Sequence, residues 1–173
     1  MADGVDPRQT VEEIPADDVI YIRVLGTAVD QYGKPEPGFF RHSTGSTSMS
    51  CDWCRHCPDA EATRHGSKTN SHLCYGVVKL SVGGIRSVGV ELPLENHDSI
   101  RQDVLHSPIP ENVAHSDLTG PKSAPEIIER HPSVENKRMA QPYATAIRDS
   151  LRELSRWVIN PPGHDDLVAR EQG

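Results

Sequence analysis

The sequence has 173 residues, enough for one domain with its own core and too few for two domains of ordinary size. Its net charge of −7 argues against a surface that is attracted as a whole to nucleic acid or to anionic membranes. The N-terminal residues lack the basic and apolar parts of a secretion signal, and every apolar run is far shorter than the about 18 residues of a membrane helix. We therefore expect a cytoplasmic protein that makes no membrane contact.

The first predicted element is a strand. Residues 1–17 are acidic, contain prolines and show no apolar period, so we expect a flexible tail there. Val19–Leu25 is rich in β-branched residues, which is typical of a buried strand. Phe39–Arg41 predicts a further extended segment after a loop rich in proline and glycine. The small, hydroxylated residues 42–50 then lead to the cysteines.

The middle of the chain predicts short elements. Asp59–His65 predicts a short helix, because Pro58 suits a first helical turn. Tyr75–Val82 predicts a second strand that Gly83 and Gly84 end, followed by a helical turn over Ile85–Gly89. Val90–Leu94 can form only an edge strand, since it contains a proline. Between residues 95 and 141, only 104–106 and 113–118 suggest strands, and 124–131 suggests a helix that Pro132 ends.

The clearest helix lies near the C-terminus. Ile147, Leu151, Leu154 and Val158 recur at the spacing that places apolar side chains on one helix face. We expect this helix to end at Asn160, with a flexible tail over 161–173. The order of elements predicts a single α+β domain over residues 18–160, with a small mixed or antiparallel sheet and a C-terminal amphipathic helix.

All four cysteines lie in one segment, a cysteine-rich loop over residues 51–74. A Cys-x2-Cys pair lets two thiolates from one tight turn reach the same ion, and tetrahedral zinc then needs two further ligands. The sequence predicts a structural zinc site that uses Cys51, Cys54 and Cys74 with either Cys57 or His72. An iron–sulfur cluster and a set of reduced, unliganded thiols are the alternatives.

A second group of residues suggests an enzyme. Arg23 lies in the first predicted strand, and the run Ser46-Thr47-Ser48 follows the second. Tyr-x-Arg followed by Ser-Thr-Ser resembles the arginine–serine–glutamate class of ADP-ribosyltransferases. This resemblance implies that Arg23 and Ser46 or Ser48 bind NAD, with Glu91 or Glu95 in place of the family's later glutamate. The structural alternative is a strand arginine paired with a carboxylate beside a polar loop.

Histidines offer a further catalytic possibility. His106, His115 and His131 lie in or beside the irregular region, and Asp103 and Asp117 are close to them in sequence. Such a pair can supply a general base and the carboxylate that orients it. The alternative is a set of solvated surface histidines.

The predicted C-terminal helix also carries a basic stripe. Arg148, Arg152 and Arg156 recur every four residues, and a stripe of this kind can contact the phosphates of a nucleic acid. Asp149 and Glu153 flank it, which also fits a solvated helix face with ion pairs between successive turns.

Over its whole length the chain resembles a set of small uncharacterised bacterial proteins. The residues that carry this resemblance are Phe40-Arg41, Met49-Ser50, Asp52-Trp53, Tyr75–Val78, Gly84–Gly89, Asn112, Ala114-His115, Gly120 and Leu151–Trp157. In that set the position of Cys51 is usually aliphatic and the cysteine cluster is absent. The comparison draws attention to Arg23, Asp52, Trp53 and His115.

The leading hypothesis from the sequence is a non-enzymatic interaction or accessory module of a bacterial cytosolic system, with another protein as its partner and a structural zinc. A small NAD-using enzyme with Arg23, Ser48 and His115 as candidate catalytic residues is the alternative. A protein that contacts nucleic acid through Arg148, Arg152 and Arg156 is a third possibility.

Overall fold

The computed structural model describes residues 10–40, 48–65, 75–91, 99–119 and 145–165. The elements in chain order are β1 (Val19–Leu25), the 3₁₀ turns η2 (Gly26–Ala28) and η3 (Pro37–Phe39), β2 (Met49–Trp53), α1 (Ala60–His65), β3 (Tyr75–Ser81), α2 (Val82–Ser87), β4 (Gly89–Glu91), β5 (Ser99–Arg101), β6 (Asp103–His106), β7 (His115–Thr119) and β8 (Arg156–Ile159). A further helix covers residues 145–154.

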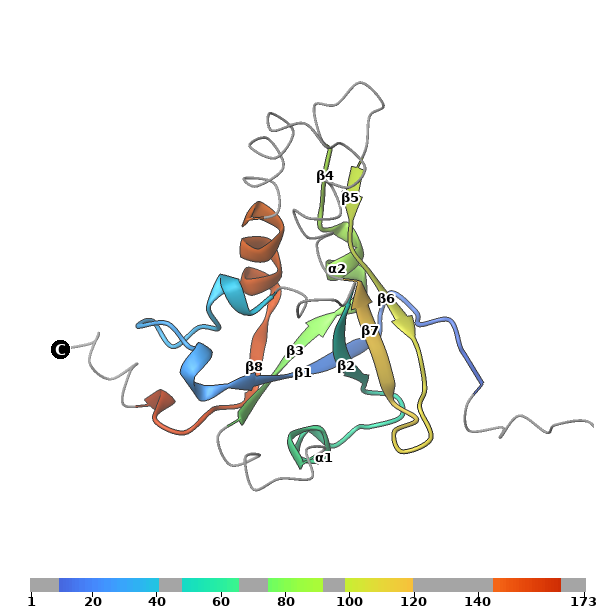
Figure 1. Ribbon diagram of the computed structural model, residues 1–173, viewed down its shortest axis with the longest axis horizontal. Coiled ribbons are helices and arrows are strands. Elements are labelled where there is room, and N and C mark those ends of the chain that lie inside the picture. Colours follow the sequence, from blue (N-terminus) through green and yellow to red (C-terminus); the bar gives the residue numbers. More distant parts are fainter. Residues whose placement is uncertain (1–9, 41–47, 66–74, 92–98, 120–144, 166–173) are drawn as a thin grey trace, which may run out of the picture.

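The centre of the molecule is a six-stranded antiparallel sheet with the strand order β6-β7-β2-β1-β3-β8 (Figure 1). The short strands β4 and β5 form a separate two-stranded sheet, which lies at the opposite end of the molecule from α1 (Figure 1). The chain therefore has a single-domain α+β fold, as the order of elements in the sequence predicts.

The two faces of the large sheet differ in chemistry because side chains alternate along each strand. Ile20, Ile22 and Val24 of β1 are fully buried and belong to the main core. Tyr21 and Arg23, between them, lie on the other face, which is polar and partly open. One strand thus supplies both the core and the candidate site.

Helices cover the apolar face. Ile147 and Leu151 of the helix over 145–154 have no exposed surface, and neither does Ile85 of α2. These side chains pack into the same core cluster as β1, together with Phe40 and Trp53. On the other face, α1 covers only part of the sheet, where Thr63 is buried.

The C-terminal helix is shorter than its apolar period predicts. It ends at residue 154, and residues 156–159 form β8, which pairs with β3. Ser155 follows the last helical residue, and its hydroxyl donates a 2.7 Å hydrogen bond back to the carbonyl of Arg152. Val158 consequently lies on a strand with 42% of its surface exposed, and does not extend the helical stripe.

The segments on either side of α2 differ in detail from the prediction. Strand β3 ends at Ser81, whose hydroxyl accepts a 3.2 Å hydrogen bond from the Gly84 backbone and caps α2. Gly83 and Gly84 therefore lie inside a helix instead of only ending a strand. Phe39 closes a 3₁₀ turn, where the sequence suggested extended structure. The helix suggested over residues 124–131 lies outside the described residues.

Both ends of the described chain pack against the domain. Ile14 is 1% exposed and joins the core, although residues 1–17 read as a flexible tail. Near the other end, Pro161 is buried, and Nε2 of His164 lies 2.9 Å from the carbonyl oxygen of Gly33. Gly33 adopts a positive φ of 73°, a conformation that glycine tolerates well. Residues on both sides of the predicted domain, residues 18–160, thus pack against it.

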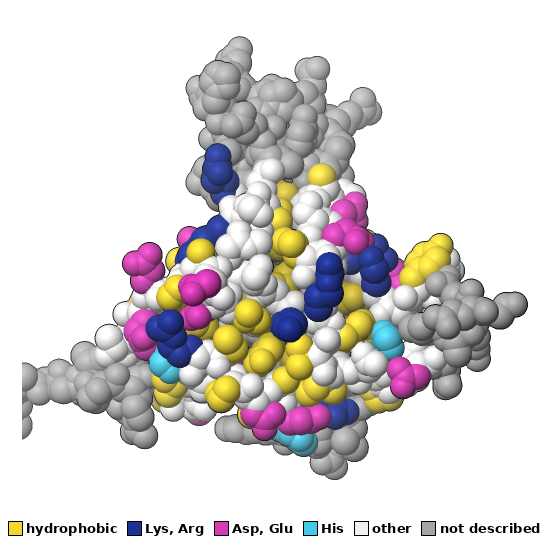
Figure 2. All heavy atoms as spheres, turned by 180° about the vertical axis from the view of Figure 1, so that it is seen from behind, with side chains coloured by type: hydrophobic (Ala, Val, Ile, Leu, Met, Phe, Trp, Pro, Cys, Tyr) yellow, Lys and Arg dark blue, Asp and Glu magenta, His cyan; other side chains and the backbone are white. Residues whose placement is uncertain are grey.

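Charge is unevenly distributed on the surface. Figure 2 shows the side opposite to that of Figure 1, where basic and hydrophobic side chains lie together in the middle and acidic ones lie mainly toward the edges. A local positive region is thus compatible with the net charge of −7. Among the helices in the described residues, none combines the length and the apolar character that a membrane crossing requires.

Candidate functional site

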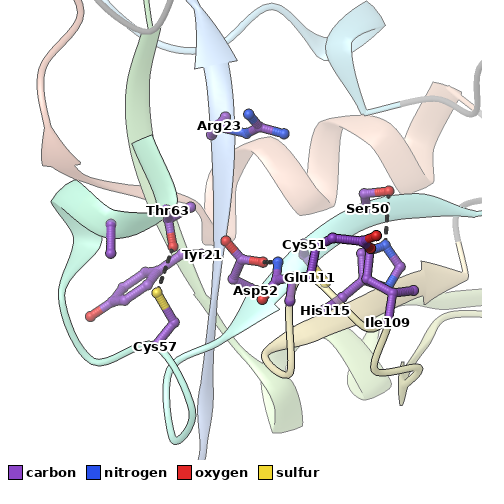
Figure 3. A pocket seen from close by; sticks show the side chains of 12 residues that line it. Tyr21, Arg23, Ser50, Cys51, Asp52, Cys57, Thr63, Ile109, Glu111 and His115 are labelled. Atoms are coloured by element: carbon purple, nitrogen blue, oxygen red, sulfur yellow. Dashed lines mark hydrogen bonds between the residues drawn. The ribbon is translucent and has the colours of Figure 1, made fainter. Parts of the chain in front are cut away.

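The polar face of the sheet contains a cavity of about 480 Å³, which we call the polar-face pocket (Figure 3). Its lining comes from strands β1, β2 and β7, from α1 and the turn before it, and from the loop that joins β6 to β7. The lining residues are Tyr21, Arg23, Ser50, Cys51, Asp52, Cys57, Ala62, Thr63, Ile109, Glu111, Asn112 and His115. Figure 3 shows the helix over 145–154 behind the sheet, on the side away from the pocket.

Strand register brings the polar side chains of the pocket together. Tyr21 is opposite Asp52 in the β1–β2 ladder, and Asp52 is opposite His115 in the β2–β7 ladder. Opposed residues of antiparallel strands project from the same face. Arg23 lies two positions after Tyr21 in β1, and Ser50 lies two positions before Asp52 in β2. Both therefore project from this face as well.

Arg23 is the basic residue of the pocket. Its guanidinium carbon lies 5.9 Å from the centre of the Tyr75 ring, which is a cation–π contact. Among the described residues, it has no hydrogen-bond or ion-pair partner. The five N–H donors of its half-buried guanidinium are therefore available to a group that enters the pocket.

Asp52 is held in place by the neighbouring loop. Asn112 donates a hydrogen bond of 2.7 Å from Nδ2 to Oδ1 of Asp52. The orientation of the Asn112 amide is fixed in turn, because its Oδ1 accepts a 3.0 Å hydrogen bond from the backbone of Ala114. One carboxylate oxygen of Asp52 is thereby occupied, while the other remains able to accept a hydrogen bond from a ligand.

His115 is at the centre of a hydrogen-bond network. Its Nδ1 lies 2.8 Å from the carbonyl oxygen of Ser107 and 3.0 Å from the Ser107 hydroxyl. The Ser107 hydroxyl donates to Oδ2 of Asp117 at 2.6 Å, and Ser48 donates to Oδ1 of the same carboxylate at 2.8 Å. On the other side of the ring, Nε2 is 3.3 Å from the hydroxyl of Ser50.

The end of the pocket near α1 is less polar. Sγ of Cys57 lies 3.5 Å from Oγ1 of Thr63. The pKa of Tyr21 is raised, chiefly because burial disfavours the charged phenolate and also because Cys54, Cys57 and Asp59 are close. The Tyr21 phenol therefore keeps its proton at neutral pH and can donate a hydrogen bond.

The structure brings together some of the residues singled out in the sequence. Arg23, Asp52 and His115 line the same pocket, whereas Trp53 is fully buried in the core. Ser48 does not line the pocket, but its hydroxyl bonds Asp117, a member of the His115 network.

Of the two glutamates that the ADP-ribosyltransferase resemblance offers, only Glu91 lies among the described residues, and it does not line the pocket with Arg23. Glu91 belongs to β4, in the separate two-stranded sheet, and Glu95 and Ser46 lie outside the described residues. Glu111, Asn112 and Ser50, which sequence reasoning did not propose as site residues, line the pocket instead. The sequence signals for Ser50 are its place among the residues of the whole-chain resemblance and its position two residues before Asp52, at strand spacing.

The cysteine site that the sequence predicts is not assembled in the described part of the chain. Cys51 is 5% exposed, belongs to the core cluster, and its thiol donates a hydrogen bond to the carbonyl of Ser116 at 3.3 Å. Burial raises the pKa of this thiol. Cys54 and Cys57 are partly exposed, and His72 and Cys74 lie outside the described residues. Cys51 therefore packs in the core, and the cysteine site stays a prediction, because two of its ligands lie outside the described residues.

A different group of side chains can hold a metal ion. One ligand atom each from Glu12, His56 and His106 lies within 4.8 Å of the other two. Nε2 of His56 is 2.9 Å from a carboxylate oxygen of Glu12, and the rings of His56 and His106 stack with centres 5.2 Å apart and planes at 13°. Both rings also contact the edge or face of Trp53.

Both ring nitrogens of His106 already have hydrogen-bond partners. Nδ1 of His106 accepts a 3.1 Å hydrogen bond from the backbone N–H of Glu12, and its Nε2 donates to the carbonyl of Val113 at 2.8 Å. A metal ion at His106 would replace one of these bonds. The group therefore also acts as a clasp that fixes the N-terminal segment, including Ile14, against the sheet.

The three arginines of the predicted basic stripe do not share one helix face. Arg152 forms an ion pair with Asp30 and donates a 3.0 Å hydrogen bond to the carbonyl of Pro35. Arg156 lies on β8, and Arg148 is partly buried. Arg152 thus serves local packing, and Arg156 lies on a different element from Arg148 and Arg152.

Comparison with protein-family models, with curated proteins and with solved structures yields no match. The function of the chain must therefore be inferred from the geometry of the polar-face pocket.

Proposed function

We propose that the protein is a binding module for a small polar ligand, which it holds in the polar-face pocket. The ligand would carry an anionic group, such as a phosphate, and hydroxyl or amino groups that donate hydrogen bonds. A sugar phosphate has this chemistry. The observation that carries the proposal is that Arg23 enters the pocket without a hydrogen-bond or ion-pair partner among the described residues.

An unpaired arginine in a pocket favours an anionic ligand for electrostatic and geometric reasons. The guanidinium forms paired, charge-assisted hydrogen bonds with carboxylates and phosphates. Partial burial lowers the local dielectric constant and so strengthens such a bond. The cation–π contact with Tyr75 keeps the Arg23 side chain extended over the sheet.

The pocket also contains carboxylates, which restrict the kind of anion. Asp52 and Glu111 line it together with Arg23. They would repel an anion that lacks hydrogen-bond donors, whereas they can accept hydrogen bonds from hydroxyl groups. A ligand with a phosphate at one end and hydroxyl groups at the other therefore fits better than a simple polyanion. The pocket volume of about 480 Å³ lies in the range of small-molecule sites.

Thermal unfolding in the presence of candidate ligands tests this proposal. The panel contains inorganic phosphate, ribose 5-phosphate, ribose and NAD, each at the same ionic strength. At ten times its dissociation constant, a ligand stabilises the folded state by about 1.4 kcal/mol, which raises the midpoint by about 3–6 °C for a domain of this size. We expect the largest shift with ribose 5-phosphate or NAD and a smaller one with inorganic phosphate.

Two variants separate the roles of the side chains. Arg23→Gln should abolish the shift in the unfolding midpoint with every phosphate-bearing ligand. Asp52→Asn should reduce the shift with ribose 5-phosphate to the size of the shift with inorganic phosphate. Arg101→Gln is the matched control, because it removes the same charge from an exposed position on β5, outside the pocket. If no ligand shifts the midpoint, or if Arg23→Gln and Arg101→Gln respond alike, the proposal is wrong.

A further inference from the structure

We infer that Ser50 is a nucleophile that His115 activates as a general base, and that the pocket cleaves carboxylic esters whose molecules also carry an anionic group. The choice of substrate rests on the proposed binding role of Arg23. The activation of Ser50 rests on a separate observation, the 3.3 Å contact between its hydroxyl and Nε2 of His115.

The tautomer of His115 follows from its hydrogen bonds. The carbonyl oxygen of Ser107, 2.8 Å from Nδ1, can only accept a hydrogen bond, so Nδ1 carries the proton. In the neutral ring Nε2 is then unprotonated and accepts the hydrogen bond from the Ser50 hydroxyl. This is the orientation in which a histidine can take the proton of an attacking serine.

A carboxylate lies behind the imidazole ring. The Ser107 hydroxyl, 3.0 Å from Nδ1 of His115, donates its own proton to Asp117 at 2.6 Å. It can therefore accept from Nδ1–H, so that one hydroxyl group links the imidazole ring to the Asp117 carboxylate. A second hydrogen bond, from Ser48, fixes the other carboxylate oxygen of Asp117. Ser107 and Asp117 are thus positioning residues for His115.

Ser50 is accessible to a substrate. It is an exposed residue of β2 and lines the same pocket as His115 and Arg23 (Figure 3). Arg23 of β1 and Ser50 of β2 lie on the same face of the sheet. Each is two residues along its strand from a member of the opposed pair Tyr21 and Asp52. An ester whose anionic group is bound by Arg23 can therefore place its carbonyl carbon near Ser50.

The proposed reaction balances without a further cofactor. Ser50 Oγ forms a bond to the carbonyl carbon while its proton moves to Nε2 of His115. The ester bond to the leaving alcohol breaks, and His115 returns the proton to the leaving oxygen. Water then attacks the acyl-serine with His115 again as the base, which releases the carboxylic acid and restores the Ser50 hydroxyl.

A neutral fluorophosphonate tests the activation of Ser50 directly, because it reacts with activated serines through loss of fluoride and needs no anion site. We expect mass spectrometry of the native protein to find the label at Ser50. His115→Gln should slow labelling by about 100-fold or more, and Ser50→Ala should abolish it. Ser87→Ala, on α2 and outside the pocket, is the control and should label at the wild-type rate.

Far-UV circular dichroism of each variant shows whether it folds, and heat-unfolded wild-type protein gives the labelling rate of an unactivated serine. If native Ser50 reacts no faster than in the unfolded chain, or if folded His115→Gln reacts at the wild-type rate, the inference is wrong. Either result leaves the ligand-induced shifts in thermal stability, and with them the proposed binding function, unaffected.

Two esters of 4-nitrophenol, the hydrogen succinate and the butyrate, test the substrate class. We expect the anionic succinate ester to have the lower KM, and Arg23→Gln to raise the KM for this ester by a larger factor than the KM for the butyrate. Equal hydrolysis of both esters by wild type and Arg23→Gln would contradict the choice of an anionic substrate, while Ser50 labelling would still support the nucleophile.

Discussion

Trp53 and Asp18 are joined by a 2.7 Å hydrogen bond from the indole Nε1 to Oδ2, although the Trp53 side chain has no exposed surface. Arg55 completes this arrangement. Its guanidinium lies 3.1 Å from the same carboxylate oxygen and 4.7 Å from the centre of the Trp53 ring. The carboxylate of Asp18 therefore accepts the hydrogen bond of the buried indole N–H at the C-terminal end of β2. The turn that follows β2 contributes Cys57 to the polar-face pocket.

Asp18→Ala should lower the free energy of unfolding by about 1–3 kcal/mol, because it leaves the buried N–H of Trp53 without an acceptor. Asp18→Asn should cost less, since its amide oxygen can still accept the bond. Arg55→Ala should cost about 1 kcal/mol or less, because the side chain of Arg55 is 48% exposed. Urea unfolding measures all three. Equal losses for Asp18→Ala and Arg55→Ala would contradict this account.

The buried thiol of Cys51 predicts a dependence of stability on pH. Its pKa is raised in the folded state, so the unfolded chain releases this proton first as the pH rises. The stabilisation is complete below the ordinary thiol pKa of about 8.5 and is lost above it, by up to about 1.4 kcal/mol per pH unit. Urea unfolding between pH 7 and 10 should show a steeper decline for wild type than for Cys51→Ala. Parallel curves would show that Cys51 ionises normally.

Two aliphatic residues, Leu151 and Val158, test where the C-terminal helix ends. Leu151→Ala should cost about 2–5 kcal/mol, because its side chain is fully buried in the core. Val158→Ala should cost less than about 1 kcal/mol, since Val158 lies half exposed on β8. Urea unfolding of both variants provides the measurement. A helix that continued through residue 158 would bury both side chains and give both variants large losses.

The clasp of Glu12, His56 and His106 predicts the effect of metal removal. Each nitrogen of His106 already has a hydrogen-bond partner, so we expect the fold to be complete without an ion. EDTA should leave the thermal midpoint of purified protein unchanged. A midpoint that falls on chelation, together with the loss of about one equivalent of zinc per chain, would show that a structural metal site exists.

Local patterns were sufficient to predict part of the fold. β1 has the predicted bounds, because a run of β-branched residues over Val19–Leu25 has few other solutions. Residues 49–53 were not predicted as a strand, since their buried members are Cys51 and Trp53 among polar residues. The helical period of Ile147, Leu151 and Leu154 continued to Val158 by coincidence, because the residues of β8 alternate with the period of a strand.

The pocket depends on contacts that no local pattern encodes. The sequence drew attention to Arg23, Asp52 and His115, but it contained no signal that they meet. Their proximity follows from the pairing of β1 with β2 and of β2 with β7, and the second pairing joins residues more than sixty positions apart. The same pairing places the side chain of Cys51 in the core, which the cysteine spacing did not indicate.

The central claim, that Arg23 is the anion-binding residue of the polar-face pocket, can be tested most directly by NMR of the arginine side chains. The Nε–Hε signal of Arg23, assigned by its absence in Arg23→Gln, should shift progressively as ribose 5-phosphate is added, while the signal of Arg101 stays in place. An Arg23 signal that does not move at ligand concentrations that stabilise the protein would contradict the account.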